Sequence, residues 1–96
     1  MTQLPINSIL TENGAFEIRE LDPGREHLLT LKNVFSGATV VLETFNTVLD
    51  KYTSVDDGSW TNEAEIRFIP TSNKASLTVS GASGSTSIGV TITPII

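Results

Sequence analysis

One candidate for acid–base chemistry in this 96-residue chain is His27, its only histidine. A histidine acts as a general base when a nucleophile and a carboxylate lie around it, but the sequence has no Gly-x-Ser-x-Gly motif to present a nucleophilic serine. His27 instead opens a β-rich segment directly after Glu26. We expect it at a strand end or on the surface, and we predict that the protein is not an enzyme and uses no cofactor.

A second candidate is the acidic run Asp56-Asp57-Gly58, which together with Glu63 could offer carboxylate oxygens to calcium. Its spacing differs from that of the twelve-residue calcium loop, which needs oxygen ligands at alternating positions and a glutamate at its end. An ordinary Asx turn over residues 56–59 is therefore the expected structure. One histidine and no cysteine also leave none of the usual zinc ligand sets, so we predict no metal site.

Trp60, the only tryptophan, follows this turn. An exposed tryptophan can stack on a sugar ring, usually beside other aromatic side chains, and here only Tyr52 and four phenylalanines are available. We expect Trp60 to pack in the core or between sheets. A carbohydrate-binding or host-adhesion module that uses Trp60, Tyr52 and residues 56–58 is the alternative function.

Net charge and length restrict the partners further. The chain carries a formal charge of −5 with six Lys and Arg, and nucleic-acid binding needs clustered basic residues, so we expect no nucleic-acid partner. No apolar run approaches the ~18 residues of a membrane span, and the start Met1-Thr2-Gln3 lacks the basic and apolar stretches of a secretory signal. We therefore expect no membrane contact, and a single domain because a chain of this length builds one modest core.

Alternation with a period of two residues is the strongest pattern in the chain, and it predicts β-strands. Apolar residues alternate with serine, threonine and glycine over residues 75–80 and 87–93, and the glycine-containing segment 81–85 between them predicts a hairpin. The expected strands are 15–21, 27–34, 40–45, 46–54, 63–69, 75–80 and 87–93. Pro70 should end one of these strands and Pro94 the last.

Turn signals recur about every 8 to 12 residues, which is typical of β-sandwiches and small barrels. We predict one all-β domain over residues 1–96: an antiparallel β-sandwich, jelly-roll-like or Greek-key, with about seven or eight short strands. Residues 1–10 should form an N-terminal arm that is flexible or contacts a partner.

A faint internal repeat at an offset of 48 residues aligns Glu17-Ile18-Arg19 with Glu65-Ile66-Arg67 and residues 29–31 with 77–79. Alternation shared by all β-strands explains such a match as well as true duplication does. If the duplication is real, two equivalent four-stranded halves should pack face to face.

The residues expected on the outer faces differ between the two halves. The segment from 75 to 96 carries no charged side chain, and a neutral strand edge without lysine can pair with another chain. Residues 27–34 and 40–45, expected as a second hairpin, turn several apolar side chains outward, which usually marks an interaction site. The predicted contact residues are Leu28, Val34, Val41, Phe45, Thr78 and Thr91. The alternative is that Leu28, Val41 and Phe45 are covered by residues 46–54 or 4–10 of the same chain.

Several stretches of the sequence resemble small β-sandwich proteins encoded among the structural genes of tailed bacteriophages. The stretches are residues 10–16 (LTENGAF), 36–43 (SGATVVLE), 57–61 (DGSWT), 77–82 (LTVSGA) and 87–92 (SIGVTI). In that family a Gly-x-x-Val-x-Leu strand precedes an Asp-Gly-x-x-Trp turn, and a Leu-x-Val-Ser-Gly-Ala hairpin closes the domain. This sequence departs from the pattern in having Ser59 alone between Gly58 and Trp60.

The resemblance implies a role in the virion, as a capsid decoration, head-fibre, or tail or neck accessory protein. Such proteins bind other virion proteins and sometimes the host surface, and no catalytic residue is carried over. We therefore expect a non-enzymatic virion protein whose partners are other virion proteins or further copies of itself.

Overall fold

The computed structural model describes residues 2–4 and 7–95, and the side chains of residues 8–55 and 58–95. In this part of the chain it has nine strands and no helix. The strands are β1 (Thr2–Leu4), β2 (Asn7–Leu10), β3 (Gly14–Ile18), β4 (His27–Val34), β5 (Thr39–Asn46), β6 (Lys51–Trp60), β7 (Ala64–Phe68), β8 (Ala75–Ser80) and β9 (Ser87–Pro94). None of the described residues forms a helix that could cross a membrane.

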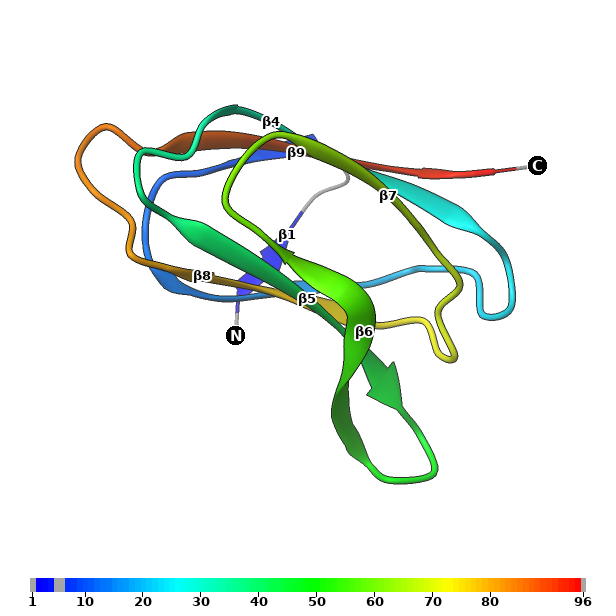
Figure 1. The fold of residues 1–96 in the computed structure, drawn as a ribbon. Coiled ribbons are helices and arrows are strands. Elements are labelled where there is room, and N and C mark those ends of the chain that lie inside the picture. The colour runs from blue at the N-terminus through cyan, green and yellow to red at the C-terminus, as the bar shows by residue number, and fades with distance from the viewer. Residues whose placement is uncertain (1, 5–6, 96) are drawn as a thin grey trace.

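The strands form two sheets that face each other (Figure 1). One sheet has the order β1-β3-β8-β5-β6, and the other has the order β2-β9-β4-β7; we call them the five-stranded and the four-stranded sheet. Strands β2, β3, β4 and β5 pair antiparallel with β9, β8, β7 and β6 in turn, while β1 adds to β3 in parallel. This nested pairing is that of one long hairpin rolled over into two sheets, the jelly roll. The predicted all-β sandwich is confirmed.

The predicted hairpins are wrong. Strand β8 lies in the five-stranded sheet and β9 in the four-stranded sheet, so residues 81–86 cross between the sheets instead of turning back within one. Strands β4 and β5 are separated in the same way. The alternating pattern predicts which side chains of a strand point inward. Those side chains point inward whether the next strand joins the same sheet or the opposite sheet. The choice between hairpin and crossover therefore depends on strand pairing elsewhere in the chain.

The N-terminal arm and the region of β5 and β6 differ from the structure expected from the sequence. The N-terminal arm pairs into both sheets, β2 against β9 and β1 against β3. The expected strand 46–54 is divided by a turn at residues 47–50, which separates β5 from β6. Residues 56–59, expected as a turn, belong to β6, where the register against β5 shifts between Val41 and Glu43.

The internal repeat has a structural counterpart. When 48 is added to the residue numbers of β4, its first residue coincides with the first residue of β8. The same addition makes both the first and the last residue of β5 coincide with those of β9. Strand β4 pairs with β7 and β9, and β8 pairs with β3 and β5, so the pairings exchange as the repeat requires. The two halves do not pack face to face as expected, because each sheet contains strands from both.

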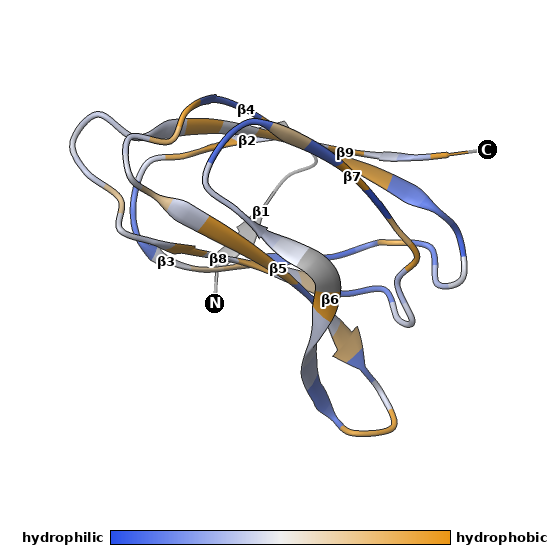
Figure 2. Ribbon diagram, in the orientation of Figure 1, coloured by the Kyte–Doolittle hydropathy of each residue, from blue (hydrophilic) through white to orange (hydrophobic). Residues whose placement is uncertain are grey.

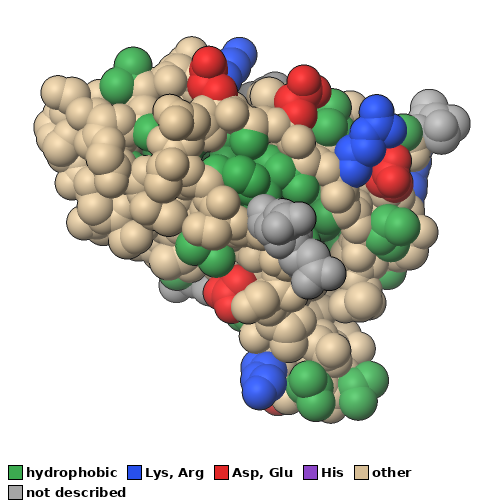
Figure 3. Space-filling view, in the orientation of Figure 1, with side chains coloured by type: hydrophobic (Ala, Val, Ile, Leu, Met, Phe, Trp, Pro, Cys, Tyr) green, Lys and Arg blue, Asp and Glu red, His purple; other side chains and the backbone are tan. Residues whose placement is uncertain are grey.

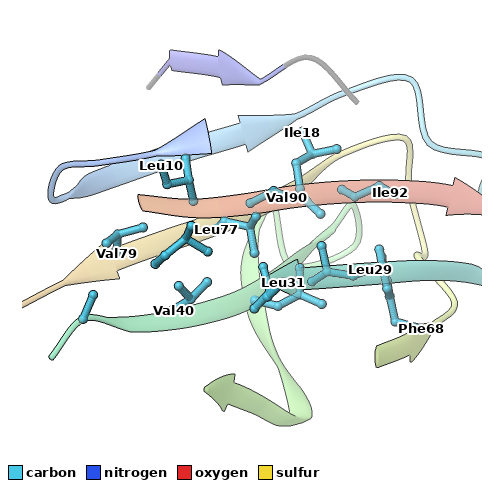
Figure 4. Packing of buried hydrophobic residues seen from close by; sticks show 14 of the residues in the cluster. Leu10, Ile18, Leu29, Leu31, Val40, Phe68, Leu77, Val79, Val90 and Ile92 are labelled. Atoms are coloured by element: carbon cyan, nitrogen blue, oxygen red, sulfur yellow. The ribbon is translucent and has the colours of Figure 1, made fainter. Parts of the chain in front are cut away.

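The core lies between the two sheets and is built from the predicted inward positions (Figure 4). Figure 2 shows hydrophobic residues following the inner strands β5 and β9. The largest fully buried apolar side chains are Leu29, Leu31, Val40, Leu42, Leu77 and Ile88. Full burial of an aliphatic side chain stabilises a fold by about 1.5–3 kcal/mol, so this layer is the main favourable contribution.

The two crossover loops, β4–β5 and β8–β9, meet at one end of the sandwich. The Thr86 hydroxyl donates to the carbonyl oxygen of Phe35 at 2.9 Å, and the Ser83 hydroxyl lies 3.2 Å from that of Ser36. The backbone N–H of Ala82 donates to Asn13 Oδ1 at 2.8 Å, which ties in the β2–β3 loop. These bonds hold the two sheets together where the chain passes between them.

The irregular part of β6 depends on Gly58. A Cβ added there would lie 2.7 Å from the carbonyl oxygen of Val55 and 3.0 Å from that of Leu42, both of them backbone atoms. We expect Gly58→Ala to lower the free energy of unfolding by about 1–3 kcal/mol, the range for overpacking a site that cannot relax. Chemical denaturation followed by Trp60 fluorescence measures it.

Gly84→Ala is the matched control, because nothing lies within 4 Å of a Cβ added at Gly84. It should change the unfolding free energy by no more than about 0.5 kcal/mol. Equal stability of the two variants would show that β6 does not pass close to β5 at this point.

Candidate functional site

His27 has a structural role. It is buried at the start of β4, its Nδ1 lies 2.7 Å from the carbonyl oxygen of Arg25, and its Nε2 accepts the backbone N–H of Asp22 at 3.4 Å. Since a carbonyl oxygen only accepts, the hydrogen must be on Nδ1. Both ring nitrogens are thus used to hold the β3–β4 connection, and Phe68 packs beside the ring at 5.8 Å. The prediction of a strand end is confirmed, and the surface location is wrong.

The other candidates for chemistry give no assembled site in the described part of the chain. No group of three metal-ligating side chains is found there, and every buried side-chain nitrogen or oxygen there has a hydrogen-bond partner. The side chains of Asp56 and Asp57 lie outside the described residues, so the calcium alternative is untested.

Trp60 packs against the core. It lies opposite Val40 in the β5–β6 pair, on the inward side, and it is half-buried in contact with the core cluster. Its ring therefore packs against the core, as predicted for the structural role.

The six predicted contact residues divide between the two outer faces of the sandwich. Leu28, Val34 and Thr91 lie on the four-stranded sheet, and Val41, Phe45 and Thr78 lie on the five-stranded sheet. Val34 is 51% exposed, whereas the other five are half-buried. They point outward as alternation predicts, but no single surface contains them all.

Strands β8 and β9 carry no charged side chain, but neither of them lies at the edge of a sheet. Strand β8 is flanked by β3 and β5, and β9 is flanked by β2 and β4, so both are interior strands. Their ladder groups are paired on both sides, and they cannot accept a further strand. The edges of the two sheets are β1, β2, β6 and β7.

A polar network covers part of the outer face of the five-stranded sheet. The Glu17 carboxylate on β3 accepts hydrogen bonds from Arg19 Nε and, at 3.4 Å, from the Tyr52 hydroxyl on β6. Tyr52 therefore spans the outer face above β5 and β8. Ser76, which lies beside Glu17 on β8, is only 2% exposed although it points outward.

Hydrogen bonding and burial in this network, together with its charges, shift the pKa values of Glu17 and Tyr52 in opposite directions. The hydrogen bond from Arg19 lowers the pKa of Glu17 below 4.5, with further help from the charge of Lys74 and from Tyr52. Burial raises the pKa of Tyr52 above 10.0, and the Glu17 charge raises it further. The Glu17 contribution to stability is thus present above pH 4.5 and is lost as the pH falls, and that of Tyr52 is present below pH 10 and is lost as the pH rises.

Phe45 packs and forms hydrogen bonds at the base of the β5–β6 hairpin. Its backbone N–H donates to the Lys74 carbonyl at 3.2 Å, and its own carbonyl accepts the Thr71 hydroxyl at 3.1 Å. The ring meets Tyr52 edge to face at 5.2 Å, and Lys74 Nζ lies 5.2 Å from the ring centroid. The alternative that residues 46–54 cover Phe45 is therefore partly right, through Tyr52.

Beyond Phe45 the β5–β6 hairpin leaves the body of the sandwich, and hydrophobic side chains gather at its tip (Figures 1 and 3). Val48 is 91% exposed and Leu49 is 56% exposed. The Asn46 side chain accepts the backbone N–H groups of both residues at 2.9 and 3.0 Å, and Asp50 ends the turn at a φ of 55°. The tip thus holds two aliphatic side chains in water on a defined turn.

Comparison with known proteins finds no matching family model, no matching curated protein and no matching solved structure. Candidate sites are therefore judged from the geometry of this chain.

The residues that sequence reasoning missed are Val48 and Leu49, together with Ile9 and Ile69, which are 66% and 58% exposed. Val48 and Leu49 were expected within the strand 46–54. The turn formers Asn46 and Asp50 on either side were the available signal, since they favour a four-residue loop with an aliphatic pair at its centre.

Tyr52 is the only tyrosine, so its ionisation can be followed by absorbance near 295 nm. We expect a midpoint above pH 10, and we expect Glu17→Gln to lower this midpoint because the neighbouring negative charge is removed.

Glu43→Gln is the control, since Glu43 lies on the same face but is not one of the groups that shift the pKa of Tyr52. A midpoint that is equal in the Glu17→Gln variant and the wild type would contradict the network.

Proposed function

We propose that this chain is a bacteriophage virion structural or accessory protein that works by protein contact and without catalysis. The observation that carries the proposal is the projecting β5–β6 hairpin, whose tip places Val48 and Leu49 in water. Its partners are other virion proteins or further copies of the chain, and its place of action is the assembled particle.

The tip has the properties of a contact element. Adjacent exposed aliphatic side chains are unfavourable in water and usually mark an interaction site. The two hydrogen bonds to Asn46 hold the turn, so little conformational entropy is lost when it docks. An apolar turn that already has its bound conformation is suited to repeated protein–protein contact.

Three of the five stretches that resemble tailed-phage structural proteins contribute to interior strands of the jelly roll. Residues 36–43 lead into β5, residues 77–82 lead out of β8, and residues 87–92 form most of β9. These strands are interior, and β5 is also one arm of the projecting hairpin. The resemblance and the hairpin together favour an assembly role.

The glycan alternative receives less support, because Trp60 faces the core and Tyr52 is engaged with Phe45 and Glu17. We expect Trp60→Ala to lower the unfolding free energy by about 2–4 kcal/mol, as loss of a partly buried aromatic does. Wild-type Trp60 should emit at blue-shifted wavelengths, and added glycans should leave the spectrum unchanged. A glycan-dependent shift would favour the adhesion function instead.

The virion proposal is tested on phage particles purified from cells that carry the gene. Quantitative mass spectrometry should find the chain in a fixed ratio to the major capsid or tail protein. A chain that is abundant in the lysate and absent from purified particles would overturn the proposal.

The role of the tip is tested in the same particles. We expect Leu49→Asp to lower incorporation at least tenfold, which corresponds to about 1.4 kcal/mol of contact free energy. Thr47→Asp is the matched control, an exposed residue of the same turn with no apolar side chain to lose. Equal incorporation of both variants would show that contact is made elsewhere on the chain.

A further inference from the structure

A hollow of about 680 Å³ lies on the outer face of the four-stranded sheet, far from the hairpin tip. It lies above Gly89 of β9, whose neighbours in register are Ile9 on β2 and Lys32 on β4. Gly89 is buried beneath the side chains of Lys32 and Asn33, and Ile9 forms an exposed apolar wall beside them. The hollow is thus open, apolar on one side and basic on the other.

The local backbone of β4 shapes this hollow. Alternation places Asn33 inward, opposite the buried Ile88, yet its φ of 81° is left-handed and its side chain is exposed. The backbone N–H of Asn33 donates to Glu63 Oε2 at 3.0 Å, which holds this conformation and brings the Glu63 carboxylate beside Lys32. Non-glycine residues with positive φ cost free energy and cluster at functional sites such as ligand clamps and switch regions.

The apolar and charged residues of the hollow and those of the hairpin tip follow one another in matching order. Across the sheet the row reads apolar Ile9, Gly89 beneath the methylene groups of Lys32, the Lys32 ammonium group and acidic Glu63. Along the tip the chain reads Val48, Leu49, Asp50 and Lys51, two apolar residues followed by an acid and a base. If the apolar pair lies on Ile9 and on the Lys32 methylene groups over Gly89, Asp50 meets the Lys32 ammonium group and Lys51 meets Glu63.

We propose that the hairpin tip of one copy docks into the Gly89 hollow of a second copy. Within one chain the tip projects on the side of the five-stranded sheet, while β9 and β4 lie on the opposite sheet, so the contact must be between molecules (Figure 1). A knob on one surface and a socket on another give a head-to-tail contact, which repeats into a ring or a filament. This inference rests on the proposed function and specifies one of its contacts.

The contact is small. Two aliphatic side chains and two ion pairs bury far less than the roughly 1,200 Å² of a stable pair, so each contact should be weak and should gain strength by repetition. The net charge of −5 on each copy also opposes association. The experiment must therefore trap the contact rather than rely on a stable dimer.

The absence of cysteine from the sequence allows disulfide trapping. A Leu49→Cys chain is mixed with an Ile9→Cys chain under mild oxidant, and the rate of the mixed disulfide is measured. Ala15→Cys replaces Ile9→Cys in the matched control, because Ala15 is also exposed but lies on the other sheet. We expect the Leu49/Ile9 pair to cross-link at least tenfold faster than the Leu49/Ala15 pair. Equal rates, or faster trapping of Leu49 with Leu49, would overturn the proposal.

Charge reversal tests the order of the contact. We expect Asp50→Lys in the Leu49→Cys chain to slow trapping severalfold, and Lys32→Asp in the Ile9→Cys chain to restore it. Circular dichroism confirms that each variant is folded, and Gly89→Leu is a second variant that blocks the site by displacing the Lys32 and Asn33 side chains that lie over Gly89. No restoration by the paired reversal together with no effect of Gly89→Leu would overturn the proposal. A chain that is incorporated into particles through its tip but fails these tests would leave the proposed function in place and refute the self-contact.

Discussion

Burial of alternate side chains between the two sheets is the interaction on which the rest of this structure depends. The crossovers after β4 and β8 carry the chain from one sheet to the other, so neither sheet can be completed by consecutive strands alone. Leu29 and Leu31 of one sheet belong to the same core cluster as Leu42 and Leu77 of the other. Such non-local contacts make folding slow and tightly couple the two halves of the chain.

The outer faces follow from this arrangement. Strands with neighbours on both sides need no charge to protect an edge, which explains why β8 and β9 carry small neutral side chains outward. The hairpin of β5 and β6 is the turning point of the rolled chain, and its end extends past the start of β8. It is therefore free to project, with Phe45, Tyr52 and Lys74 supporting its base.

The candidate contact sites arise where alternation is interrupted. Asn33 turns outward at a position where the pattern predicts an inward residue, and Gly89 contributes no side chain beside it. Val48 and Leu49 are exposed because they belong to a turn rather than to a strand. Each exception departs from the pattern that builds the core, and each leaves a surface that a partner can use.

The sequence by itself determined the all-β class, most strand bounds and the inward residues, because an alternating pattern has one stable solution when one face must be buried. It also placed Trp60 and the first residues of β4 correctly. Only the tertiary structure decided which strands pair, since a short loop can turn back or cross over without changing any inward side chain. It thereby also decided that Leu28 and Phe45 lie on opposite faces and that the exposed apolar pair is at the hairpin tip.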